Sequence, residues 1–346
     1  MVLDVVHRSR ILNARRTARY TARIAFPNWR HALPRVSVLM PMKNAEPYVR
    51  RAARSVLDQD CSDLELIVVD DGSTDRSVVE VEALRDSRVR ILSGPCRGVS
   101  ASWNLAFTQS TGAIVMQCDA DDLYPPDRIA WQLRFLDSHP EFGAVCGGFA
   151  TMAPSGEPIA NLWQPTSTGT ELTQELLAGK TRAHLCAYAA RREALESIGG
   201  KREYFTSAED IDLQLRLAEV CRVWFEPRLA YMYRLHDSSL THTQASNQRR
   251  FYEDYARQLR AQRAAGRIDD LEAGAPLTPP SAAAAPDGAR KHLQGILTGE
   301  AWRKHRLGHR SEAVRLGLRA LRMAPGSFSA WRSLAALFLK GTRACQ

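Results

Sequence analysis

The sequence predicts an α/β fold built on a parallel sheet. Between residues 36 and 138, short apolar runs rich in Val and Ile alternate with amphipathic helical stretches. Such alternation is typical of βαβ units, whose sheets are covered by helices on both faces. Acidic residues directly follow two of the predicted strands, and sheets of this kind bind ligands at the carboxyl ends of their strands. The fold class therefore predicts where a functional site should lie.

The predicted elements follow in order along the chain. Strands are expected at 36–40, 64–70, 88–92 and 113–118. Helices are expected near 49–57, 75–86, 99–110 and 126–138. Beyond residue 150 the pattern is less regular, with a helix near 209–220, short strands at 222–226 and 229–234, and a charged helix at 243–264.

The C-terminal part predicts helices that are attached through a linker. The Pro/Ala/Gly-rich stretch 274–289 has little to bury. Beyond it, "WRSLAALF" (331–338) matches the W-x2-L-A-x2-F pattern of a tetratricopeptide repeat, and Leu297 and Ala301 lie one period earlier. A generic amphipathic hairpin is the alternative. Because a repeat and a half cannot bury its own apolar face, we expect the segment to dock on the main domain or on a partner.

Four regions are thus predicted. They are a basic N-terminal extension (1–33), a main α/β domain (34–265), a Pro/Ala-rich linker (266–289) and a helical, repeat-like segment (290–346).

The composition is that of an ordinary globular protein, with 45% hydrophobic and 25% charged residues. No run approaches the roughly 18 apolar residues that a membrane-spanning helix needs, and the N-terminus lacks the apolar core of a signal peptide. The seven cysteines are scattered and form no CxxC pair. This pattern fits reduced thiols, so we expect a cytoplasmic protein.

The net charge of +9 is concentrated in the flanks. Residues 1–35 hold eight Arg and one Asp, a net +7, and residues 289–346 hold twelve Lys or Arg and two Glu, a net +10. No nucleic-acid-binding module accompanies these flanks, so we expect no nucleic-acid partner. Anionic lipid attracts basic residues by about 1 kcal/mol each, which makes the inner face of the cell membrane a candidate contact. An Arg-rich solvated face is the alternative.

The stretch "IVMQCDADDLYPPDR" (114–128) places Asp119, Asp121 and Asp122 directly after a predicted buried strand. Three carboxylates at one strand end repel one another unless positive charge lies nearby. Mn²⁺ and Mg²⁺ prefer oxygen ligands, and Mg²⁺ commonly uses one or two carboxylates together with phosphate oxygens. Alternate residues of an extended segment point the same way. The motif therefore predicts a divalent-metal site, with Asp122 as a turn residue or an outer neighbour.

A second acidic pair lies at the same predicted edge of the sheet. In "VVDDGSTD" (68–75), Asp70 and Asp71 end a strand, and a carboxylate can accept the N–H groups of a nucleobase. In "PMKN" (41–44), Pro41 and Asn44 end the neighbouring strand, where they are candidates for lining a base pocket.

Five motifs, in this order and spacing, resemble the family 2 glycosyltransferases with their GT-A fold. They are "VSVLMPMKN", "LELIVVDDGSTD", "GVSASWNLA", "GAIVMQCDADDLYPPDRI" and "GGKREYFTSAEDIDLQLRL", and they cover about residues 34–240. One departure is Trp103, which stands where family members commonly carry Arg.

The resemblance implies a role for individual residues. Nucleotide binding would fall to Pro41, Asn44, Asp71 and Asp119, the last near the ribose. Asp121 would bind a divalent metal, Mn²⁺ or Mg²⁺, and His236 of "YRLH" is either a further metal or phosphate contact or a surface histidine. Asp210, next to Glu209, would be the catalytic base.

The implied function is that of an inverting glycosyltransferase of the hexosyltransferase type. It would move a sugar from a nucleotide-diphosphate donor, with UDP favoured, to a saccharide or lipid-linked acceptor in surface polysaccharide synthesis. The alternative is a non-catalytic, sugar-nucleotide-binding protein that recruits a partner or self-associates through residues 290–346. A nucleotidyltransferase is disfavoured because the chain lacks a convincing Gly-rich phosphate loop.

Overall fold

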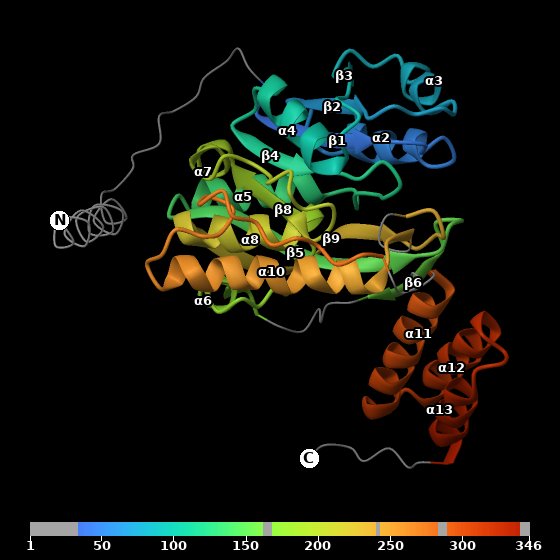
Figure 1. Cartoon of the computed structure of the whole chain (residues 1–346). Coiled ribbons are helices and arrows are strands. Elements are labelled where there is room, and N and C mark those ends of the chain that lie inside the picture. Colours follow the sequence, from blue (N-terminus) through green and yellow to red (C-terminus); the bar gives the residue numbers. More distant parts are fainter. Residues whose placement is uncertain (1–33, 162–167, 240–242, 283–288, 340–346) are drawn as a thin grey trace.

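A computed structural model describes residues 34–161, 168–239, 243–282 and 289–339, and shows a twisted sheet covered by helices on both faces (Figure 1). The strands are β1 (Val36–Met42), β2 (Leu64–Asp70), β3 (Val89–Ser93), β4 (Ile114–Gln117), β5 (Phe142–Met152), β6 (Pro158–Asn161), β7 (Thr170–Glu171), β8 (Tyr188–Arg191) and β9 (Arg222–Arg234). The helices of the main domain are α2 (Val49–Leu57), α3 (Ser77–Glu82), α4 (Val99–Gln109), α5 (Arg128–Ser138), α6 (Thr173–Leu177), α7 (Arg192–Ser197), α8 (Glu209–Val220) and α10 (Ser246–Ala264). A short 3-10 turn, η1 (Leu185–Ala187), precedes β8.

The sheet is mixed, whereas the sequence predicted a parallel one. Its order is β3-β2-β1-β4-β8-β5-β9-β7, with β6 paired to β5. The four predicted strands are confirmed as β1 to β4, and all three pairings among them are parallel. The antiparallel strand β8 lies between β4 and β5. The two short strands expected at 222–234 are a single strand, β9, whose pairing with β5 shifts register near Gly147 and Gly148.

Alternating side chains of the strands build a core on each face of the sheet. In β1, Val36, Val38 and Met40 pack with α2 and α5 on one face. Leu39, between them, packs with residues of α4 and α8 on the other face. Because both faces are covered, the strands read as nearly continuous apolar runs, which is why their positions could be predicted.

Buried Glu65 of β2 links three segments through hydrogen bonds. Its Oε1 accepts bonds from Ser37 Oγ at 2.7 Å and from the Thr111 N–H at 2.6 Å. Burial by itself would raise the pKa of Glu65, but the bonds from Ser37 and Thr111, with the charge of Arg90, lower it below its ordinary value. The ionised carboxylate therefore stabilises the folded state.

The C-terminal helices α11 (Ala289–Arg306), α12 (Arg310–Met323) and α13 (Phe328–Leu339) extend from the end of the main domain near β6 (Figure 1). They dock through one apolar cluster, in which Leu297 and Ala320 meet Ile159 and Ala160 of β6 and Leu235 after β9. The expected docking on the main domain is thus observed. The assignment of these helices to a tetratricopeptide repeat stays a prediction.

The first part of the predicted linker lies against the main domain. Asp269 is fully buried and pairs with Arg202 and Arg263, and the Leu277 N–H donates to Tyr255 Oη of α10 at 3.1 Å. The division of the chain into domains stays a prediction.

Two further sequence expectations concern the cysteines and membrane-spanning helices. The six cysteines in the described part of the chain are free thiols. Within that same part, none of the helices combines the length and the apolar character that crossing a bilayer requires.

Candidate active site

The predicted site residues gather around the carboxyl ends of β1, β2, β4 and β9 and the N-terminus of α8. These four strands run in the same direction, so their ends reach one edge of the sheet. Residues that lie more than 100 positions apart in the chain are brought into contact there.

Asp71 follows β2 and is 5% exposed. Its Oδ2 accepts a bond from the Gly98 N–H at 2.8 Å, and its Oδ1 accepts one from Ser102 Oγ at 2.7 Å. Both partners lie at the start of α4, where unpaired N–H groups and the helix dipole favour a carboxylate. Asp71 therefore fixes α4 to the sheet edge, and each of its oxygens keeps a further acceptor position.

Asn44 ties the loop after β1 to the loop after β2. It adopts a positive φ of 51°, which Asn tolerates better than most residues. Its Oδ1 accepts a bond from the Thr74 N–H at 2.8 Å, and its own N–H donates to Ser73 Oγ at 2.9 Å. Pro41 lies half-buried near the end of β1. The nucleotide contacts expected of Pro41, Asn44 and Asp71 stay predictions.

Asp119 lies two residues beyond the end of β4 and is held by three hydrogen bonds. Gln117 Nε2 donates to its Oδ1 at 2.6 Å, and the thiol of Cys186 donates to its Oδ2 at 3.2 Å. The Asp119 N–H donates to Tyr231 Oη of β9 at 3.0 Å. Burial raises the pKa of the Cys186 thiol, and the negative charge of Asp119 raises it further. The thiol thus stays protonated and acts as a hydrogen-bond donor.

Asp122 is fully buried, whereas Asp119 and Asp121 are partly exposed. Its Oδ1 accepts a bond from the Arg234 N–H at 2.6 Å. Burial raises the pKa of Asp122 well above its ordinary value, and the nearby charges of Asp121 and Asp119 raise it further. The shift favours the uncharged carboxyl, so a proton on Asp122 relieves part of the repulsion within the motif.

Asp121 and His236 form a pair, although 115 positions separate them. His236 Nε2 lies 2.8 Å from Asp121 Oδ2, and the side chain of Asp121 is 26% exposed. The ring of Tyr48 packs between His236, at 4.8 Å between ring centroids, and the Arg234 guanidinium, at 4.9 Å from the ring centroid. The histidine is therefore part of the site and not an isolated surface residue.

The N-terminus of α8 carries two carboxylates with different surroundings. Glu209 Oε1 lies 3.4 Å from Lys201 Nζ, and the Lys201 side chain is fully buried. Burial raises the pKa of Glu209, Lys201 lowers it, and Asp210 and Asp119 raise it. The carboxylate of Asp210 has neither a hydrogen bond nor an ion pair within the described residues. Ala208, which directly precedes α8, has a positive φ of 59°. This conformation costs energy for a residue with a Cβ atom.

The turn that carries Lys201 is fixed by α4 and α8. Asn104 bonds to the backbone of Lys201 twice, at 2.8 and 2.9 Å, and Arg216 Nη2 donates to the Gly200 carbonyl at 2.8 Å. The Lys201 ammonium lies 5.7 Å from the ring centroid of Trp103. Trp103 thus supports a cation that arrives from another segment.

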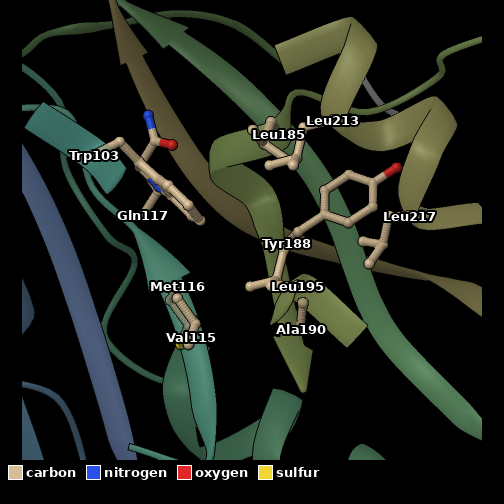
Figure 2. A pocket seen from close by; sticks show the side chains of 10 residues that line it. All are labelled: Trp103, Val115, Met116, Gln117, Leu185, Tyr188, Ala190, Leu195, Leu213 and Leu217. Carbon is tan, nitrogen blue, oxygen red and sulfur yellow. The ribbon is translucent and has the colours of Figure 1, made fainter. Parts of the chain in front are cut away.

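A small cavity of about 20 Å³ lies behind the site, between β4, β8 and α8 (Figure 2). In Figure 2, Trp103 and Gln117 close one side of it, and Tyr188, Leu185 and Leu213 stand opposite. A cavity of this size has room for one water molecule. It cannot hold a nucleotide.

Comparison with known proteins shows what this domain is similar to. Residues 37–199 match the family model described as Glycosyl transferase family 2. These residues, slightly less than half of the chain, resemble a family 2 glycosyltransferase domain. The chain is 30% identical over 209 residues to the chondroitin synthase of Pasteurella multocida (strain Pm70), and 30% identical over 207 residues to a hyaluronan synthase of Pasteurella multocida. These matches cover 60% and 59% of this chain but only 21% of either relative. The chain thus spans about a fifth of the length of these curated relatives.

Solved structures share the fold of this domain. S. aureus TarS 1–349 in complex with UDP-GlcNAc aligns with a TM-score of 0.54 and 17% identity, covering 84% of this chain and 82% of that chain. The mannosyltransferase PcManGT from Pyrobaculum calidifontis, in complex with GDP-Man and Mn²⁺, aligns with a TM-score of 0.50 and 22% identity, covering 95% and 86%. The expected GT-A type of α/β fold, with added C-terminal helices, is thereby confirmed.

Asp121 and His236 are the residues of this domain that would hold a divalent metal. Asp121 and His236 supply one oxygen and one nitrogen ligand side by side. Among the residues that the structure describes, no three His, Cys, Asp or Glu side chains surround a common metal position. The single carboxylate of Asp121 suits Mg²⁺ or Mn²⁺, and Mg²⁺ keeps positions for water and substrate phosphate. The imidazole nitrogen of His236 is a ligand that transition metals bind better than Mg²⁺ does.

The sequence analysis did not identify several residues of the site. Lys201, Cys186, Tyr231 and Arg234 all contact the acidic residues, yet no local pattern marks them. Lys201 has one weak signal, since it directly follows the glycine pair of "GGK".

Proposed function

We propose that the chain is a metal-dependent, inverting glycosyltransferase that uses a nucleotide-diphosphate sugar, with UDP as the favoured nucleotide. The observation that carries the proposal is the meeting of the Asp119–Asp121 loop with the N-terminus of α8 at one edge of a family 2 domain. Gln117, which donates to Asp119, and Leu213 of α8 line the same small cavity, so these two segments lie close together. One segment is suited to the donor, and the other is suited to the acceptor.

The donor side rests on residues that the fold already holds in place. Asp119 is fixed by Gln117 and Cys186, so its carboxylate is oriented before a ribose arrives. Such preorganisation lowers the entropic cost of binding. The nucleotide complexes of TarS and PcManGT support a nucleotide sugar as the donor class.

Asp210 is the proposed base. It lies in the first turn of α8, where the helix dipole attracts negative charge, and its carboxylate oxygens have no hydrogen-bond or ion-pair partner within the described part of the chain. Glu209, in contrast, is tied to Lys201 and helps to position the helix start. A base that takes the proton of an acceptor hydroxyl contributes typically ~10²–10⁴-fold, or roughly 3–5 kcal/mol. One base opposite one leaving group predicts inversion at the anomeric carbon.

Asp121 and His236 would hold the divalent metal, Mn²⁺ or Mg²⁺. When bound, the metal supplies positive charge against the diphosphate leaving group. The Mn²⁺ complex of PcManGT supports this part of the proposal.

The similarity to chondroitin and hyaluronan synthases supports a saccharide acceptor or a lipid-linked precursor of a surface polysaccharide. We place the enzyme in the cytoplasm, peripheral to the inner face of the cell membrane. A protein partner or a second copy at residues 290–346 belongs to the same proposal.

The test uses the full chain with a panel of UDP-, GDP- and dTDP-sugars, with and without Mn²⁺. Thermal shift identifies the donor, and release of the nucleoside diphosphate reports turnover. We expect Asp121→Ala to abolish metal-dependent donor binding. We expect Asp210→Asn to bind the donor normally and to lose turnover by about 10²-fold or more.

A matched control is Asp254→Asn, which removes an exposed carboxylate on α10 away from the site and should change neither quantity. If wild type binds no nucleotide sugar with metal, the proposal fails. If it binds one but Asp210→Asn leaves turnover unchanged, the assigned base is wrong. Donor binding without turnover on any saccharide acceptor would favour the non-catalytic alternative.

A further inference from the structure

Helix α13 is apolar on two faces, of which only one is covered. Its sequence, FSAWRSLAALFL, contains a single charged residue, Arg332. Ala330 and Leu334 pack against α12, and Leu337 packs with Ala301 of α11 and Ala313 of α12. The helices approach closely because α12 has Gly317 at the contact, where a Cβ atom would lie 2.9 Å from Leu334 Cδ1. This first face needs no further partner.

The second face forms an exposed apolar stripe, defined here as Phe328, Trp331, Phe338 and Leu339. Their exposed fractions are 79%, 55%, 57% and 84%. At 3.6 residues per turn these positions span an arc of about 100°, which is the width of a face that a helix usually buries. Within the described part of the chain, every exposed Phe, Trp or Tyr side chain belongs to this stripe.

The surroundings of the stripe are basic. Arg332 is exposed on α13, and the exposed Arg310 of α12 donates to the Phe338 carbonyl at 3.1 Å. Residues 289–346 hold only two acidic residues, and both are paired: Glu300 with Arg303 and Glu312 with Lys304. The positive charge beside the stripe therefore has no acidic counterpart within the described helices.

We propose that the stripe of α13 inserts into the interface of an anionic membrane. Trp and Phe side chains favour the boundary between headgroups and acyl chains, and flanking Arg side chains bind anionic headgroups. A second copy of the chain is a poorer match, because facing stripes would bring Arg310 and Arg332 of both copies together without a carboxylate between them. A bilayer with negative charge satisfies both the apolar and the basic part of the surface.

The stripe lies on the helices that dock beside the candidate active site. The docking cluster includes Leu235, and the next residue is His236, the partner of Asp121. Insertion of α13 would thus hold the carboxyl edge of the sheet near the bilayer, where a lipid-linked acceptor is located. Membrane binding itself does not depend on the proposed transfer reaction.

The test is co-sedimentation of the full chain with vesicles of phosphatidylcholine, with or without about one third phosphatidylglycerol. We expect binding to the anionic vesicles that weakens with salt. The variant Phe328→Ser/Trp331→Ser/Phe338→Ser should bind at least about tenfold more weakly. The control Val79→Ser/Ile268→Ser/Leu277→Ser removes three exposed apolar side chains elsewhere and should bind as wild type does.

The readouts separate the possible occupants of the stripe. Circular dichroism shows whether each variant is folded, and quenching by brominated lipid should decrease in Trp331→Phe if that indole enters the bilayer. Absence of wild-type binding at low salt overturns the inference, as does equal loss in both triple variants. Light scattering that shows a dimer, and a monomer after the α13 substitutions, would assign the stripe to a second copy instead.

Discussion

Replacing Lys201 by Met should destabilise the protein in a way that depends on pH. At 3.4 Å, the attraction between the Lys201 ammonium and the Glu209 carboxylate is about 5 kcal/mol at an effective dielectric constant of ~20. Removing one partner of a buried pair typically costs about 3–5 kcal/mol, because the other charge is left without compensation. We expect Lys201→Met to lower the free energy of unfolding by this amount at about pH 8.

The loss should shrink as the pH falls, because Glu209 can then take up a proton. Burial already raises the pKa of Glu209, and Lys201 opposes that effect, so the variant raises the pKa further. A carboxyl whose pKa is higher in the folded state than in the unfolded state stabilises the fold only at low pH. This stabilisation is lost as the pH rises from about 4.3, the ordinary pKa of Glu, through the raised pKa of the folded state. At about pH 5 we expect a residual loss of ~1 kcal/mol, from the ammonium that no longer lies over Trp103.

The measurement is urea unfolding of each variant at both pH values. Lys201→Arg keeps the charge and serves as the control. Lys201→Met/Glu209→Gln removes both charges and should recover about 2–3 kcal/mol at high pH relative to the single variant. Equal losses at both pH values, without recovery in the double variant, would refute the electrostatic reasoning and leave packing as the role of Lys201.

Three further predictions concern the turn, the sheet and the docked helices. Gly200→Ala should lower the free energy of unfolding by about 1–3 kcal/mol, because the added Cβ would lie 2.7 Å from Asn104 Oδ1 at a φ of +70°. In Gly199→Ala, where φ is similar but nothing lies within 4 Å, the loss in the same denaturation assay should stay near 1 kcal/mol. Glu65→Gln should lower the free energy of unfolding near neutral pH by about 1–3 kcal/mol. Because the pKa of Glu65 is lowered in the folded protein, this difference from wild type should vanish as the pH falls through that lowered pKa. Leu235→Ala should cost about 2–5 kcal/mol of docking energy, seen as faster amide hydrogen exchange in α11–α13 with little change in β1–β4.

The local parts of the fold could be predicted, and the long-range pairings could not. Strands β1, β2 and β4 are buried on both faces and therefore show as apolar runs. The strand β8 has only four residues, YAAR, without a turn signal on either side. Its antiparallel insertion follows from packing that no local pattern records.

The same limit applies to the candidate site. The acidic motifs identified the carboxyl edge of the sheet, because their positions follow directly from strand ends. The raised pKa of Asp122 results chiefly from burial, and the backbone that covers it includes Arg234, which is 112 positions away. The pairing of Lys201 with Glu209 depends on a turn that Asn104 of α4 holds, 97 positions earlier. Such pairs combine residues that are individually unremarkable in sequence.

The attachment of the helical segment at Leu235 has a thermodynamic consequence. Leu235 packs with α11 and α12, and the next residue, His236, pairs with Asp121, so both contacts lie on one short stretch of backbone. If a ligand at Asp121 displaces His236, the same displacement changes the docking equilibrium of the helices. By linkage, whatever binds the helices must then change the affinity at Asp121 by the same factor. Membrane binding by the helices would then change the affinity for a ligand at Asp121 without any direct contact between the membrane and that ligand.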